Sequence, residues 1–179
     1  MTTAAPAESE RPRARVREAE RADLLAVYHI EQESFPQPWP FTAFEGFLGE
    51  AGFLVAQVDR GDSPRDPSRV GDDGRVVGYV VADVVSDHDA GMGHVKDLAV
   101  AEECRGAGVG KRLLGRALGA LTTEGAESVK LEVRRSNDAA RSLYRQFGFE
   151  HQGTVPRYYE NGEDALVLVR DLRPTFPGE

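Results

Sequence analysis

The chain has one cysteine, one tryptophan and no long apolar run among its 179 residues. A single cysteine excludes an internal disulfide framework, so we expect a cytoplasmic protein in a reducing compartment. No apolar stretch approaches the roughly 18 residues that a membrane span needs, so we expect no membrane partner. The first residues, MTTAAPAESERPRA, lack the basic start and apolar stretch of a secretory signal and are typical of a disordered tail.

The chain also lacks an excess of positive charge. It carries 22 Lys and Arg against 30 Asp and Glu, which gives a net charge of −8. Non-specific binding of nucleic acid needs a basic face, so we expect no nucleic-acid partner. A local basic cluster can still bind one anionic ligand, and its residues are Arg105, Lys111, Arg112 and Arg116.

The apolar patterning predicts one α/β domain over residues 15–173, between an N-terminal tail at 1–14 and a C-terminal tail at 174–179. Strands are predicted at 15–17, 53–58, 75–85, 94–100, 128–133 and 165–169, and helices at 22–35, 41–50, after the glycines of 106–110, and at 137–147. The order is β-α-α-β-β-β-α-β-α-β, which indicates a mixed sheet. The Asp-rich insertion Asp59–Gly74 is predicted to be a solvated loop.

The stretch ECRGAGVGKRLLG, residues 103–115, combines glycines with basic residues just before an apolar helical stripe. A Walker A loop is excluded, because Arg105 stands where its first glycine belongs and Arg112 where its Ser or Thr belongs. A dinucleotide fingerprint is excluded as well, because Lys111 takes the place of its third glycine. An anion cradle at a helix N-terminus and a simple glycine turn without a ligand both stay open.

Two motifs resemble the GNAT superfamily of acetyl-CoA-dependent N-acetyltransferases. Residues Arg105 to Gly110 match its pyrophosphate motif Q/R-x-x-G-x-G/A, and LEVRRSNDAARSLYRQFGF resembles the corresponding segment of RimI-type N-terminal acetyltransferases. GHVKDLAV and ESFPQPWP are similar to a strand and a substrate-side loop of such enzymes. The resemblance covers roughly residues 15–171. It implies a GNAT fold, with a mixed, mostly antiparallel sheet of about six to seven strands and about four helices.

The resemblance also implies how the co-substrate acetyl-CoA is held. The backbone of the strand Leu98, Ala99 and Val100 is expected to pair with the pantetheine arm. The pyrophosphate is expected at Arg105, Gly106, Ala107, Gly108, Val109, Gly110 and Lys111. Asn137 is expected to bind pantetheine with its amide, although SND is also a strong helix-capping sequence.

Catalytic candidates follow from what acyl transfer to an amine requires. Alternation in VKLEV turns Glu132 away from the aliphatic face, where a salt bridge or a solvated position is the ordinary interpretation. The resemblance makes Glu132 the base, with a pKa that partial burial would raise toward neutrality. It makes Tyr144 the acid, while the helical stripe alone indicates a core tyrosine. His94 is a secondary candidate for the base.

The remaining polar residues suggest fewer roles. Cys104 has no neighbouring His and acid in the sequence, so direct transfer is favoured over an acyl-cysteine. The run SDHDAGMGH, with Asp87, His88, Asp89 and His94, is better explained as a turn than as a metal site, and no metal is expected.

Aromatic residues in polar loops point to the acceptor. The resemblance assigns Phe35, Trp39, Tyr158 and Tyr159 to loops that grip a peptide N-terminus, and packing of these loops on the core is the alternative. The expected acceptor is a protein or peptide α-amine, for which a ribosomal protein is one candidate. A GNAT enzyme acting on lysine or a small amine, and a non-catalytic acyl-CoA-binding domain, remain as alternatives.

Overall fold

The computed structural model describes residues 14–59, 74–87 and 90–173, which form one seven-stranded sheet. The strand order is β1-β2-β3-β4-β5-β7-β6. The strands are β1 (Arg15–Glu18), β2 (Leu54–Asp59), β3 (Gly74–Asp87), β4 (Ala90–Val100), β5 (Ala126–Arg134), β6 (Glu150–Val155) and β7 (Ala165–Asp171). Among these pairs only β4 and β5 run parallel. The expected mixed, mostly antiparallel sheet is confirmed.

The tails at residues 1–13 and 174–179 lie outside the described residues, as do 60–73 of the insertion and 88–89 of the candidate metal run. The sequence patterning missed β6 and placed the start of β4 too late. The segment Glu150–Val155 is exposed along most of its length and lacks apolar alternation. It becomes a strand because the neighbouring β7 supplies its hydrogen bonds, from Glu150 opposite Val169 to Val155 opposite Ala165.

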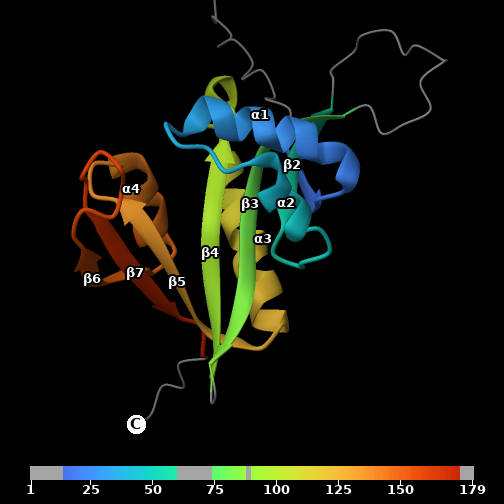
Figure 1. The fold of residues 1–179 in the computed structure, drawn as a ribbon. Helices are drawn as coiled ribbons and strands as arrows, with labels where there is room; N and C mark the ends of the chain where they lie inside the picture. The colour runs from blue at the N-terminus through green and yellow to red at the C-terminus, as the bar shows by residue number, and fades with distance from the viewer. Residues whose placement is uncertain (1–13, 60–73, 88–89, 174–179) are drawn as a thin grey trace, which may run out of the picture.

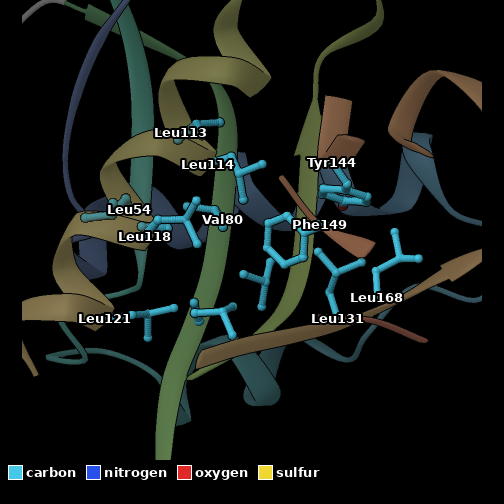
Figure 2. Packing of buried hydrophobic residues seen from close by; sticks show 14 of the residues in the cluster. Leu54, Val80, Leu113, Leu114, Leu118, Leu121, Leu131, Tyr144, Phe149 and Leu168 are labelled. Carbon is cyan, nitrogen blue, oxygen red and sulfur yellow. The ribbon is translucent and has the colours of Figure 1, made fainter. Parts of the chain in front are cut away.

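Four α-helices cover the two faces of the sheet (Figure 1). The helices α1 (Leu24–Ser34) and α2 (Phe41–Gly46) pack on one face, where Leu24, Phe44 and Tyr79 belong to one buried cluster. The helices α3 (Val109–Thr123) and α4 (Asp138–Gln146) pack on the other face, above a larger cluster that Figure 2 shows. The predicted stripe of α3 is confirmed, because all of its members are buried: Leu113, Leu114, Ala117, Leu118 and Leu121.

The parallel strands β4 and β5 pair only at their beginnings, and then diverge (Figure 1). The last paired residues are His94 and Lys130. Beyond them β5 continues against β7, and β4 continues against β3 with a bulge at Lys96. In the described part of the chain, the second half of β4 therefore has no strand on the side that faces β5. We call the region where the two strands part the fork.

Backbone donors of β4 point into this fork. The Ala101 N–H donates to the Val77 carbonyl on the β3 side, at 2.8 Å. Successive N–H groups along a strand alternate in direction, so those of Val100 and Leu98 point to the opposite, open edge.

None of the described helices has the length and hydropathy of a membrane span.

Candidate active site

The glycine loop leads directly into α3 and leaves backbone donors free for an anion. Gly106 and Gly108 adopt positive φ angles of 75° and 79°, and Gly108 caps the helix. A Cβ added at either glycine would meet no atom within 4 Å, so the constraint is the backbone conformation and not crowding. The first N–H groups of a 15-residue helix lack intrahelical acceptors, and its dipole favours negative charge there. This geometry fits a pyrophosphate.

Of the two basic residues beside the loop, Arg105 is held by hydrogen bonds and Lys111 is exposed. The Arg105 Nε donates to the Val100 carbonyl at 2.9 Å, and a terminal guanidinium nitrogen lies 3.4 Å from the Ser34 hydroxyl. Arg105 is thus held against the end of β4 and α1. Lys111 is exposed on the first turn of α3. Cys104 is half-buried, and its sulfur lies 4.0 Å from the Arg75 guanidinium.

The strand residues expected to hold pantetheine lie at the fork. The Val100 N–H faces the open edge, while the Val100 carbonyl is engaged by Arg105. The Leu98 N–H donates to the Asp97 side chain at 2.9 Å. Ala99 is buried, and its N–H points toward β3. An extended ligand arm that enters the fork would therefore meet the Val100 N–H as a donor, whereas the Leu98 N–H is already engaged by Asp97.

Glu132 and His94 meet across the fork. The two strands bring the His94 Nε2 to 2.6 Å from the Glu132 Oε2, and each side chain keeps about a fifth of its surface exposed, 20% and 21%. The hydrogen bond from His94 lowers the pKa of Glu132 below its usual value, and this outweighs the opposing effect of burial. The predicted rise of the Glu132 pKa toward neutrality is therefore wrong. Glu132 is ionised at neutral pH.

The two candidate catalytic groups lie on opposite faces of the sheet. Leu131 and Val133 are buried under α3 and α4, so Glu132 between them faces the side of α1 and α2. Tyr144 comes from α4, is 8% exposed and packs against Phe149 with ring centroids 5.8 Å apart (Figure 2). The fork separates the two groups, so a carboxylate is presented from one face and a phenol from the other.

Tyr144 is a protonated phenol. Burial, the largest cause, raises the pKa of Tyr144 above its usual value. No described residue hydrogen-bonds its hydroxyl, and burial disfavours the ionised form. The hydroxyl is therefore free to donate to a ligand atom. The expected core packing of Tyr144 is confirmed, and it is compatible with this role.

The loop between β6 and β7 is anchored beside Glu132. The Arg134 guanidinium, two residues after Glu132, stacks 3.7 Å from the centre of the Tyr159 ring. Arg134 also pairs with Glu163 at 3.1 Å, and Glu163 accepts the Ser136 N–H at 2.8 Å. The hydrogen bonds from Ser136, and then Arg134, lower the pKa of Glu163 to about 2.

Tyr158 and Tyr159 differ in how firmly they are held. Tyr159 is half-buried under Arg134, whereas Tyr158 is 53% exposed and touches Tyr159 edge to face at 5.0 Å. An exposed aromatic ring on an anchored loop is suited to contact a partner.

Phe35 and Trp39 pack on the core from the loop after α1. Trp39 lies over Phe44 and Phe47, with centroids 5.7 and 5.9 Å away, and Phe35 is half-buried against the same cluster. The packing alternative is thus what the structure shows, and contact with an acceptor stays a prediction. Asn137 caps α4, because its side-chain oxygen accepts the Ala140 N–H at 3.1 Å. Its amide nitrogen is not used by the cap, so pantetheine binding also stays a prediction.

Sequence reasoning missed a polar network beside the fork, made of the buried Glu31 and Tyr79 and the half-buried Asp97. The Tyr79 hydroxyl contacts the carboxyl groups of both Glu31 and Asp97. The available signal was the position of Glu31 in the apolar stripe of α1, where Leu24 and Val27 are also buried. Among the described residues there is no His, Cys, Asp and Glu cluster that could hold a metal ion.

Comparisons with known proteins relate this chain to acetyltransferases. The model of the acetyltransferase (GNAT) family matches residues 24–149. An uncharacterized N-acetyltransferase of Methanocaldococcus jannaschii is 35% identical over 158 residues, covering 87% of this chain and 90% of that protein. A putative ribosomal protein bS18-alanine N-acetyltransferase of Bacillus subtilis is 34% identical over 160 residues, covering 87% and 94%. The solved structure of Ard1 from Thermoplasma volcanium is similar with a TM-score of 0.75 and 27% identity, covering 90% of this chain and 99% of that one.

Proposed function

The chain belongs to the GNAT family of acetyltransferases, and on that premise we propose that it transfers the acetyl group of acetyl-CoA to the α-amine of a protein N-terminus. The relative in Bacillus subtilis is named for an alanine α-amine of a ribosomal protein, which supports this class of acceptor. A ribosomal protein is accordingly our first candidate substrate.

The lowered pKa of Glu132 is the observation that favours an α-amine over a lysine. A protein α-amine has a pKa of about 7.7–8.0, so a substantial fraction is neutral near pH 7.5. A lysine amine has a pKa of about 10.4, so only about one molecule in a thousand is neutral there. A base with a low pKa is poorly suited to removing a proton from lysine. It suits an amine of which a substantial fraction arrives neutral.

In this proposal Glu132 orients the amine and takes its proton as the new bond forms. The Glu132 carboxylate accepts an amine N–H, and His94 holds the carboxylate in place through the 2.6 Å contact. The proton of the amine nitrogen becomes acidic when its lone pair bonds to carbon, so the carboxylate can accept it at that stage. Acetyl-CoA supplies the thioester carbonyl as the electrophile.

Tyr144 completes the transfer from the opposite face. Its hydroxyl donates a proton to the departing sulfur, and the raised pKa of Tyr144 keeps that proton in place until the thiolate develops. The proton that Glu132 took from the amine then passes through solvent to the Tyr144 phenolate, which restores both groups. The glycine loop holds the pyrophosphate, and the open edge of β4 aligns the arm that carries the thioester.

Matched peptides test this function. One peptide has a free α-amine and arginine in place of every lysine, and the other has a blocked α-amine and one lysine. We expect acetyl transfer to the first with a kcat/KM at least about a hundredfold above the second. Transfer to the blocked lysine peptide alone would overturn the proposal. Binding of acetyl-CoA without turnover of any amine would favour a binding module.

A further inference from the structure

Two carboxyl groups, the buried Glu31 and the half-buried Asp97, share one tyrosine hydroxyl between α1 and β4. Glu31 is 1% exposed, and Tyr79 is 0% exposed. The Tyr79 hydroxyl contacts the Glu31 Oε2 closely and lies 3.1 Å from the Asp97 Oδ2. The three side chains come from α1, β3 and β4, so they join the helix layer to the strand that borders the fork.

The number of hydrogens in this cluster determines its protonation. The Tyr79 hydroxyl has one hydrogen, so it can donate to only one of the two carboxyl groups. The other contact needs a second hydrogen, which a protonated carboxyl must donate to the tyrosine oxygen. Burial, and then the charge of Glu31, raise the pKa of Asp97 well above its usual value, which agrees with this count. Two adjacent ionised carboxylates at this depth would repel each other without a compensating cation.

Both ends of this polar cluster terminate on backbone N–H groups. The other oxygen of Glu31 accepts the Trp39 N–H at 2.7 Å, in the loop that follows α1. The other oxygen of Asp97 accepts the Leu98 N–H at 2.9 Å, at the open edge of β4. A continuous chain of hydrogen bonds therefore connects the Trp39 backbone to the Leu98 backbone.

We propose that a protonated Asp97 donates to Tyr79, which donates to Glu31, and that this relay positions the loop 35–40 against the fork for the acceptor. The inference rests on the proposed function, because it takes that loop as part of the acceptor site. Glu31, Tyr79 and Asp97 are positioning residues and touch neither reacting atom. The relay acts by fixing the Trp39 backbone, so its loss weakens the placement of the acceptor and leaves the pyrophosphate site intact.

The variants are chosen to separate charge from hydrogen bonding. Tyr79→Phe keeps the ring and removes the shared hydroxyl. Asp97→Asn keeps a neutral group with a donor for Tyr79 and an acceptor for the Leu98 N–H, whereas Asp97→Ala removes both. Tyr28→Phe is the matched control, because Tyr28 packs on the hydrophobic cluster that contains Tyr79 and no described residue hydrogen-bonds its hydroxyl.

Steady-state kinetics with a free-α-amine peptide give the first test. We expect Tyr79→Phe and Asp97→Ala to raise the KM for the peptide about tenfold and to leave the KM for acetyl-CoA within about twofold. Asp97→Asn and Tyr28→Phe should stay within about twofold of the parent in both constants. An Asp97→Asn variant as impaired as Asp97→Ala would show that an ionised Asp97 is needed, and would overturn the relay. Equal changes in both KM values would overturn it as well.

The single tryptophan gives a second test that needs no turnover. We expect acrylamide to quench Trp39 fluorescence more strongly in Tyr79→Phe than in the parent, with no change in Asp97→Asn or Tyr28→Phe. Unchanged quenching in a folded Tyr79→Phe would overturn the relay. If the parent acetylates no α-amine, the proposed function fails while this measurement still decides the relay. If Asp97→Ala does not fold, Tyr79→Phe and Asp97→Asn still decide it.

Discussion

Replacing Glu132 with glutamine removes the proposed base while keeping its shape. Glutamine retains an oxygen that accepts the hydrogen bond from His94, now 2.6 Å from Glu132, so the arrangement across the fork should persist. A general base contributes about 10²–10⁴ to the rate. At about 1.4 kcal/mol for each factor of ten, the variant should lose about 3–5 kcal/mol of transition-state stabilisation.

The cost to stability should be far smaller. A hydrogen bond to a charged group contributes about 1.5–3 kcal/mol and a neutral one about 0.5–1.5 kcal/mol, so Glu132→Gln should lower the free energy of unfolding by about 1 kcal/mol. The side chain keeps 21% of its surface exposed, which reduces this value further. A large kinetic loss with a small loss of stability identifies a catalytic role.

Three measurements on purified Glu132→Gln decide the matter: kcat/KM with an α-amine peptide, acetyl-CoA affinity by calorimetry, and urea unfolding. Glu127→Gln is the matched control, because Glu127 is an exposed residue near the start of the same strand. We expect the control to behave as the parent. A loss of less than about fivefold in kcat/KM for Glu132→Gln, or an equal loss of acetyl-CoA affinity, would refute the reasoning.

Four further predictions follow from the site. Tyr144→Phe should lower kcat at least about tenfold without weakening acetyl-CoA binding, and unchanged turnover would exclude the proton-donor role. Gly108→Ala should raise the KM for acetyl-CoA and cost about 1 kcal/mol, since φ is 79° there. The control Gly119→Ala, in the interior of α3 with open space around it, should leave that KM unchanged. Arg134→Met should raise the KM for the peptide but not for acetyl-CoA, because it frees the β6–β7 loop; equal KM changes would contradict this. The pKa of Glu132 is lowered on folding, so its stabilising contribution is present above about pH 4.3 and is lost as the pH falls through the folded value. The free energies of unfolding of the parent and of Glu132→Gln, measured in urea, should therefore differ more at pH 7 than at about pH 2.

The sequence predicted the elements that have strong periodicity. The stripe of α3 and the alternation in β5 are confirmed, because each pattern repeats often enough to select one face. The cap of α4 by Asn137 is also confirmed. The edge strand β6 was missed, because pairing with β7 forms it without an apolar pattern.

The sequence could not predict contacts between distant residues. The pKa of Glu132 falls because His94 lies across the fork, and only the parallel register of β4 and β5 brings these residues together. Similarly, Glu31 resembles an ordinary helix residue until Tyr79 and Asp97 are seen beside it. The types of the site residues are visible in the sequence, whereas their protonation depends on tertiary neighbours.

The central claim is that this site selects an α-amine. One peptide that carries both a free α-amine and an internal lysine tests it directly, because both amines then compete at the same concentration. After partial reaction with acetyl-CoA, fragmentation in a mass spectrometer locates the acetyl group. We predict acetylation at the α-amine with the lysine unmodified. Acetyl groups on the lysine side chain, with the α-amine left free, would contradict the account.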